Sequence, residues 1–402
     1  MKFLALLPFL AVTSLTAAPT FAPWSYTERS LFPSAIVSTA TVDWNGEEQA
    51  AEDQKTPEDP HPRKRDLPIY GDENGWLGVE LFGLPKAAQV EVEISIDGFM
   101  KPSRWKGKVR RTSKGDARIF PKAAWDYEAL LKVRQQRPVT ATFKVTVNGE
   151  PLPDETEVCV MKSLNDCPFY VIWDDDGEEF DDFSWLFAAY VNENHPLVDS
   201  ILKEALDTGV ISAFSGYQSG DTEQVMQQVF AVWNVLQRRG IKYSDISVTT
   251  PSKFVVSQSV RFINDTIHAT QANCVDGAVL IASILRKIGI KASLVMVPKH
   301  CFVAFATGND DDAELVGLET TMLGNDRLKS SVELAQLPDE IRHRELQKSY
   351  KTFSRAVATG NRQLQEHVDD FESGDDPNIQ LISISDAREL GITPLASEAG
   401  AE

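Results

Sequence analysis

Hydrophobic and polar residues alternate strictly in two stretches of the first half of the chain, residues 90–97 and 139–147. Such a period of two places one face of a strand on a core and the other face in water. Asn148 and Gly149 follow the second stretch, and this dipeptide is a strong signal for a tight hairpin turn. The two stretches therefore predict long antiparallel strands.

The alternation resumes at Val158 and Val160, and we interpret residues 35–44 as a first strand. We expect residues 25–165 to form an antiparallel β-sandwich domain that resembles immunoglobulin-like folds. Inside it, residues 47–66 contain three prolines and almost no large apolar side chain, which predicts an exposed, disordered loop. This domain offers no cluster of catalytic side chains, so we interpret it as a spacer or docking module.

After Trp173 the apolar residues follow a helical period, which predicts three helices. They lie at residues 183–191, 198–206 and 225–236. Just before them, residues 174–177 read Asp-Asp-Asp-Gly, but ligand positions one and twelve of an EF-hand would be apolar here. We therefore interpret these acids as caps of the next helix. Residues 166–395 are predicted to form a second domain of the α+β class, and residues 396–402 a frayed tail.

The N-terminus has the pattern of a secretory signal peptide over residues 1–18. Lys2 precedes an apolar run at residues 3–12, and small residues then lead to Ala18, near which we expect cleavage. The run is shorter than the ~20 apolar residues that a membrane-spanning helix needs. We therefore expect an exported protein, periplasmic or extracellular, without a membrane span.

Composition narrows the function classes. The 402 residues suggest two domains, and 59 acidic against 40 basic residues give a net charge of −19. Such a charge repels a phosphate backbone, so we expect no nucleic-acid partner. Four cysteines are too few for a disulfide scaffold, although Cys159 and Cys167 could either form a local disulfide or simply pack. No motif for a cofactor or a metal is found, and we expect neither.

The side chains with reactive chemistry gather in residues 271–321. Asn273 is a good helix cap, and a helical apolar face follows it until Gly289. Cys274 therefore lies in the first turn, where unsatisfied N–H groups and the helix dipole favour the reactive thiolate. Extended runs are predicted next at residues 292–297, 300–306 and 314–318.

A cysteine on a helix is thus followed by His300 at the start of one predicted strand and by Glu319 at the end of another. In this order His300 can take the thiol proton of Cys274, while Glu319 orients the imidazole and stabilises its charge. Taken singly, a cysteine in an apolar helix is more often a small buried residue. The spacing favours chemistry, because 26 residues separate Cys274 from His300 and 19 more lead to Glu319, enough for a helix, a turn and strands.

The same stretch resembles the transglutaminase-like superfamily. The resemblance rests on Cys274-Val275-Asp276, the apolar helix, Gly289-Ile290, His300-Cys301-Phe302 and Leu318-Glu319-Thr320-Thr321, and it covers roughly residues 180–325. It implies an α+β fold related to papain-like cysteine proteases, with Cys274 as nucleophile, His300 as base and Glu319 as the residue that orients the base. The last motif is similar to that of a bacterial secreted branch.

The chain departs from the superfamily at two points. The usual acid is Asp, so Glu319 must reach one methylene further, and a Gly often stands where this chain has Lys299. The oxyanion donor is open: the N–H of Cys274 is the main candidate, and the side chains of Gln258 and Gln271 are others. Asp276 is expected to serve the helix N-terminus rather than the reaction.

Cys301 should point to the opposite face of its strand from His300 and be buried. A regulatory disulfide between Cys301 and Cys274 is the alternative. The function expected from the resemblance is thiol-dependent acyl transfer on peptide or amide bonds of a protein or peptide substrate, as protease, deamidase or cross-linking enzyme. The main alternative is a catalytically inactive relative that acts as a cell-envelope binding or structural protein, and acyl transfer from a thioester cofactor has less support.

Overall fold

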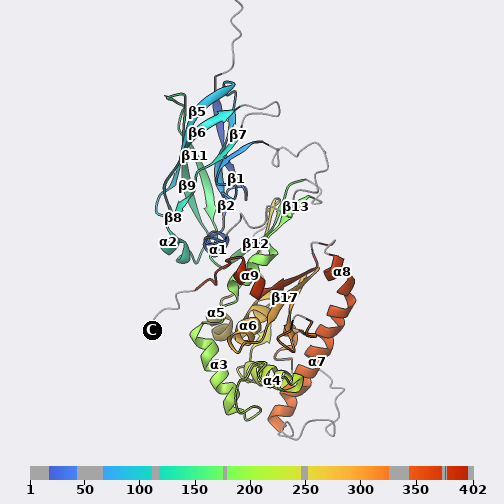
Figure 1. The fold of residues 1–402 in the computed structure, drawn as a ribbon. Coiled ribbons are helices and arrows are strands. Elements are labelled where there is room, and N and C mark those ends of the chain that lie inside the picture. The colour runs from blue at the N-terminus through green and yellow to red at the C-terminus, as the bar shows by residue number, and fades with distance from the viewer. Residues whose placement is uncertain are drawn as a thin grey trace, which may run out of the picture. The chain divides into compact units, whose positions relative to one another are not determined.

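The computed structural model describes residues 18–42, 67–110, 117–174, 179–245, 252–310, 312–325, 344–373, 376 and 378–396. It is a mixed α+β fold with several sheets, as the sequence predicted (Figure 1). The expected loop at residues 47–66, nearly all of the expected signal peptide and residues 397–402 of the expected tail lie outside the described residues.

The chain divides into two compact units. The first comprises Met1–Arg29, Pro62–Asp126 and Pro138–Cys159, and the second comprises Ser30–His61, Tyr127–Arg137 and Val160–Glu402. Two short segments of the expected β domain, residues 30–42 and 127–137, therefore pack with the second unit, although they precede most of it in the sequence.

The first unit is built on strands. A four-stranded sheet has the order β1 (Thr20–Ser25), β4 (Leu77–Phe82), β7 (Ala117–Phe120), β3 (Ile69–Gly71). A larger sheet has the order β2 (Ser30–Leu31), β11 (Glu155–Met161), β9 (Arg137–Val147), β5 (Ala87–Ile96), β6 (Met100–Arg110), β8 (Ala124–Trp125), with β10 (Glu150–Pro151) beside β9. Of this sheet, β2 and the last two residues of β11 are counted with the second unit. Most of the pairs are antiparallel, but β3 with β7 and β2 with β11 are parallel, which the prediction had not included.

The two strands that the alternation predicted are β5 and β9, which pair with each other and bury every second side chain. The hairpin after β9 is also confirmed, since Asn148 and Gly149 both have positive φ, 53° and 89°. The inward face of β11 was predicted wrongly. Cys159 and Met161 are the buried residues, whereas the Val158 side chain is 62% exposed, so the alternation is present with the opposite phase.

The expected first strand at residues 35–44 is wrong where the structure describes it. Residues Pro33–Ser38 form the short helix α1, and all of them except Val37 are buried. Pro33 sits at the first helical position, where its fixed φ favours a helix and its missing N–H costs nothing. The β-branched pair Ile36 and Val37 suggested a strand, but in so short a segment the packing of the second unit decides.

The second unit combines three small sheets with helices. Its strands are β12 (Asp166–Ile172), β13 (Phe180–Asp182) and β15 (Val255–Ser259) in one sheet, β14 (Lys242–Tyr243) with β16 (Gln271–Ala272), and β19 (Leu315–Leu318), β18 (His300–Ala306), β17 (Ala292–Val297) and β20 (Gln380–Ser383) in that order. Its helices are α1, α2 (Tyr127–Leu131), η2 (Ser184–Tyr190), α3 (Pro196–Asp207), α4 (Thr222–Arg238), α5 (Ile263–Ala269), α6 (Cys274–Lys287), η3 (Thr320–Met322), α7 (Arg344–Glu366), α8 (Val368–Ser373) and α9 (Ile384–Glu389).

The three helices predicted from periodicity correspond to η2, α3 and α4, with Trp233 fully buried in the last. The expected capping role of the acids after Trp173 is wrong for the described part of that run. Asp174 precedes the strand β13, and the N–H of Ser184 at the start of η2 bonds instead to Asp182. In the described part of the chain, every helix falls short of the length or the hydrophobicity needed to cross a bilayer.

Candidate active site

The nucleophile candidate stands at the start of α6, which the sequence predicted and the structure confirms. Asn273 Oδ1 accepts a hydrogen bond from the N–H of Asp276 at 2.8 Å, and the Asp276 carboxylate accepts one from the N–H of Asn273 at 3.0 Å. This reciprocal pair is a capping box, which satisfies two N–H groups that the helix leaves unpaired. Cys274 is therefore the first helical residue, and it is partly exposed.

Asp276 also ties the start of α6 to the segment before α5. Its carboxylate accepts hydrogen bonds from the backbone N–H of Arg261 at 2.7 Å and from Arg261 Nη1 at 2.9 Å. Burial raises the pKa of Asp276, and these hydrogen bonds act in the opposite direction. With both oxygens occupied, Asp276 fixes the position of Cys274, which confirms its expected service to the helix N-terminus.

The base candidate, His300, is the first residue of β18, directly after the turn that joins β17 to β18. Lys299 in this turn has a φ of +64°, a left-handed conformation that favours glycine. This explains physically why a Gly suits the position before the His, and the Lys299 side chain is exposed. The next residue, Cys301, is fully buried, as predicted, and burial raises its pKa well above the usual range.

Glu319 follows β19 and joins it to the short helix η3. Its Oε2 lies 2.6 Å from Nε2 of His300. Its other oxygen, Oε1, accepts hydrogen bonds from the N–H of Thr321 at 3.0 Å and from the Thr321 hydroxyl at 2.6 Å. Burial raises the pKa of Glu319, but the hydrogen bond and charge of His300 and the bonds from Thr321 outweigh burial, so that pKa lies below its usual value. Glu319 is therefore a buried, fixed carboxylate.

The three side chains form one electrostatic unit. Burial lowers the pKa of His300, but hydrogen bonding to Cys274 and Glu319 outweighs it and raises that pKa to about 10. The imidazolium form therefore predominates at neutral pH. Because Glu319 can only accept, Nε2 of His300 carries a hydrogen, and Nδ1 is the ring nitrogen left to exchange a proton with Cys274. The hydroxyl of Thr320 contacts the carbonyl oxygen of Cys274 at 3.5 Å, so η3 and the start of α6 are adjacent.

Tyr243 is a site residue that sequence reasoning missed. It lies on β14, opposite Ala272 in a parallel pair, and its side chain is 43% exposed. Burial and the charges of Cys274, Asp245 and Glu319 raise its pKa, so the phenol stays neutral beside the candidate triad. No local pattern could reveal it, because the pairing joins two-residue strands almost 30 positions apart.

The remaining expectations concern the glutamines and the other cysteines. Gln271 is exposed on β16 opposite Lys242, and Gln258 lies on β15 opposite Cys167, so the oxyanion role of either side chain stays a prediction. All four cysteines are free. The packing alternative for Cys159 and Cys167 is therefore the one that the structure supports, and burial raises the pKa of both thiols.

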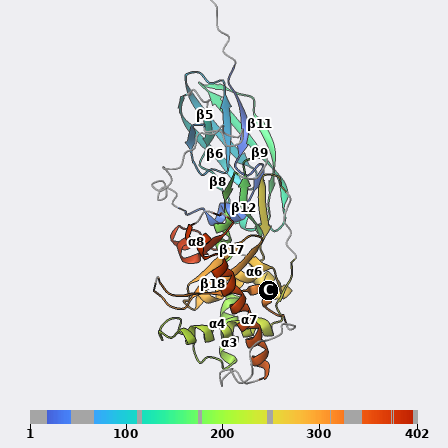
Figure 2. The same ribbon diagram turned by 90° about the vertical axis from the view of Figure 1, so that its right-hand side faces the viewer.

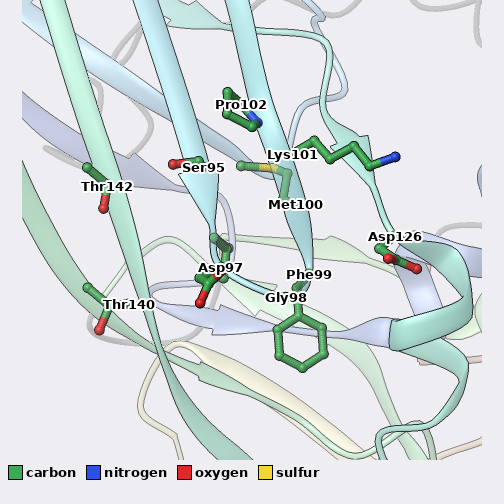
Figure 3. A pocket seen from close by; sticks show the side chains of 11 residues that line it. Ser95, Asp97, Gly98, Phe99, Met100, Lys101, Pro102, Asp126, Thr140 and Thr142 are labelled. Atoms are coloured by element: carbon green, nitrogen blue, oxygen red, sulfur yellow. The ribbon is translucent and has the colours of Figure 1, made fainter.

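A separate pocket of about 530 Å³ lies in the first unit, around the turn that joins β5 to β6. Figure 3 shows Ser95 and Thr142 on neighbouring strands, with Asp97 at the turn. None of the three candidate residues lines it. Among the described residues of the whole chain, no group of three His, Cys, Asp or Glu side chains is placed to hold a metal ion.

Comparisons with known proteins give no match. Neither a family model, nor a curated protein, nor a solved structure is similar enough to the chain to be identified.

Proposed function

We propose that this protein is an exported, transglutaminase-like protein that uses Cys274, His300 and Glu319 for thiol-dependent acyl transfer on peptide or amide bonds. The observation that carries the proposal is the 2.6 Å hydrogen bond between His300 and Glu319, whose other oxygen is held by Thr321. A buried carboxylate that fixes an imidazole next to a cysteine at a helix N-terminus is the arrangement that activates a thiol.

The reaction would begin with His300 protonated, because the imidazolium stabilises a neighbouring thiolate. The sulfur of Cys274 attacks the substrate carbonyl carbon, and the oxygen takes the negative charge next to the N–H of Cys274. His300 then gives its proton to the leaving nitrogen as the C–N bond breaks, and an amine leaves behind a thioester on Cys274. Water or a second amine attacks the thioester, returns a proton to His300 and frees the thiolate.

The domain identities belong to the same proposal. The helix α6 followed by the hairpin of β17 and β18 and by β19 supports the transglutaminase-like assignment of residues 166–395. The two sheets of the first unit support a β-sandwich with an immunoglobulin-like resemblance. For this domain we propose the role of a spacer or docking module, and for the whole protein a location outside the cytoplasm.

The first test is alkylation of the thiols by iodoacetamide at pH 5–6, with mass spectrometry to locate the label. We expect rapid labelling of Cys274 that depends on His300, because the neighbouring imidazole takes the thiol proton and stabilises the charge on the sulfur. Cys301→Ala is the matched control: it removes the neighbouring buried thiol and should leave the labelling of Cys274 unchanged. Labelling that is as fast in His300→Ala as in the wild type would contradict the proposal.

The second test distinguishes turnover from the inactive alternative. A panel of amide substrates, with and without a primary amine acceptor, is incubated with the wild type and with Cys274→Ala. Release of amine that depends on Cys274 supports an enzyme, and the acceptor decides between hydrolysis and cross-linking. Reactive Cys274 without turnover of any amide would favour the binding or structural role.

A further inference from the structure

The strand that leads to Glu319 lies at the end of its sheet. β19 pairs with β18 along one side, with Leu318 opposite Val303 and Val316 opposite Phe305, and it is the last strand in the order of the sheet. Successive N–H groups of a strand point to opposite sides. Those of Gly317 and Glu319 point away from β18, and an edge of this kind needs other partners.

Both N–H groups find their partners in α7. The N–H of Gly317 donates to Oδ1 of Asn361 at 2.7 Å, and the N–H of Glu319 donates to the carbonyl oxygen of Ala356 at 3.1 Å. Figures 1 and 2 both show α7 running alongside the sheet that contains β17 and β18. A helix thus takes the place that a further strand would have at this edge.

Two glycines permit this contact. A Cβ atom on Gly360 would lie 2.3 Å from the carbonyl carbon of Gly317, and a Cβ on Gly317 would lie 2.4 Å from that of Gly360. Neither glycine has a positive φ, so close approach rather than an unusual backbone explains them. Glycine inside a helix is less favourable than alanine, and Gly360 comes one turn after Ala356, on the same face of α7. The close contact between Gly360 and Gly317 therefore offsets the loss of helix stability that a glycine causes in α7.

We propose that α7, through Gly360, Asn361 and the carbonyl of Ala356, positions Glu319 for its hydrogen bond to His300. This inference rests on the proposed function for its meaning in catalysis. The hydrogen bonds from the N–H groups of Gly317 and Glu319 to α7 fix the main chain at Glu319, and Thr321 fixes one carboxylate oxygen. The other oxygen then has little freedom besides its approach to His300. Asn361, Gly360 and Ala356 act through Glu319 and are positioning residues.

Among the described residues, four titratable groups surround this carboxylate, and one of them is the buried thiol of Cys301. His300 on β18 faces it directly, Cys274 at the start of α6 acts on His300, and the neutral phenol of Tyr243 on β14 lies nearby. Loss of the α7 contact would loosen the hydrogen bond between Glu319 and His300 while these other groups stay in place. The hydrogen bond and the negative charge that Glu319 offers the imidazolium would then weaken, and the pKa of His300 would fall.

The test measures the pKa of His300 by NMR in the full chain labelled at histidine. There are six histidines, and His300→Gln identifies the signal by its loss. We expect Gly360→Ala and Asn361→Ala each to lower the pKa of His300 by about 1 pH unit. Asn361→Asp keeps an acceptor oxygen for the N–H of Gly317 and should hold that pKa at or above the wild-type value. Ala358→Gly, at an exposed position of α7, weakens the helix without touching β19 and should not change it.

Each outcome decides the inference. A wild-type pKa of His300 in Asn361→Ala overturns it, even if Gly360→Ala fails to fold, because Asn361 is exposed and its replacement removes no buried side chain. An equal fall in Ala358→Gly also overturns it, since general weakening of α7 would then be the cause. The proposed function can fail separately: Cys274 that is inert towards iodoacetamide would refute thiol chemistry and leave the NMR result intact.

Discussion

The first turns of the helices α6 and η3 are each closed by a buried carboxylate. Asp276 bonds to the N–H of Asn273, and Glu319 bonds to the N–H of Thr321, so each acid closes the first turn of its helix. Their second partners differ: Asp276 meets the permanently charged Arg261, whereas Glu319 meets His300, which can give up its proton.

The difference between these partners changes the pKa of two acids that are both buried. Burial outweighs the hydrogen bonds at Asp276 and raises its pKa, whereas His300 and Thr321 outweigh burial at Glu319 and lower its pKa. An acid whose partners are all fixed serves the fold. An acid whose partner titrates can also serve chemistry, and the pairing therefore separates a structural carboxylate from a candidate catalytic one.

The largest expected effect tests whether the start of α6 carries the reaction. Cys274→Ala and His300→Ala should each lower turnover by about 10⁴-fold or more, and the double variant should lose no more than the single ones, because they break one unit. The melting temperature of Cys274→Ala should stay near that of the wild type, since Cys274 is partly exposed. Steady-state kinetics and calorimetry check both points, and turnover that survives in Cys274→Ala would refute the assignment.

At the start of η3, Glu319→Gln should reduce turnover by roughly 10²- to 10⁴-fold, a smaller loss than that of Cys274→Ala. The amide keeps the shape but removes the charge that supports the imidazolium of His300. The pH profile of the His300 imidazole, followed by NMR, should move downwards, because the carboxylate charge that holds its proton is gone. An unchanged pH profile would show that Glu319 only caps its helix, as Asp276 does.

The opposite pattern is expected for Asp276→Asn. The amide cannot accept from Arg261 and Asn273 at both oxygens, so the free energy of unfolding should fall by about 1–3 kcal/mol. The pH profile of the remaining activity should be that of the wild type. Chemical denaturation and pH–rate measurements on the same samples compare the two properties, and a shifted profile would place Asp276 in the proton-transfer unit.

The smallest effect is the pH dependence of stability. His300 has a folded-state pKa of about 10 against an ordinary value of 6.5, so it binds its proton more tightly in the folded chain. Its contribution to stability is fully present below pH 6.5 and is lost as the pH rises through about 10. Denaturation at several pH values in this window should show a decline that His300→Gln reduces. An identical decline in that variant would assign the effect to other groups.

Sequence patterns predicted the start of α6, but they did not predict the contacts that position Glu319 at the start of η3. The cap at Asn273, the helix that follows and the bounds of β17 and β18 could all be predicted, because capping chemistry and periodicity are local. The candidate triad followed from spacing and resemblance. The structure brings His300 and Glu319 together and places Cys274 close enough to His300 to form a hydrogen bond with it.

The parts that the sequence did not predict depend on long-range contacts. The partners of Glu319 in α7, and Tyr243 on its two-residue strand, come together only through tertiary packing. The predictions of a strand where α1 lies and of the buried face of β11 were wrong for the same reason. In short segments of mixed character, the neighbouring elements decide which side chains are buried.

The hydrogen bonds from β19 to α7 also bear on the order in which the protein matures. The N–H groups of Gly317 and Glu319 donate to the Asn361 side chain and to the Ala356 carbonyl. These two acceptors leave the ribosome about 40 residues after Glu319, which takes seconds at a synthesis rate of ~5–20 residues per second. Until then a nascent chain contains Cys274, His300 and Glu319 but lacks α7, the helix that covers the edge strand β19. The newly made polypeptide therefore acquires its finished centre only after α7 has been synthesised.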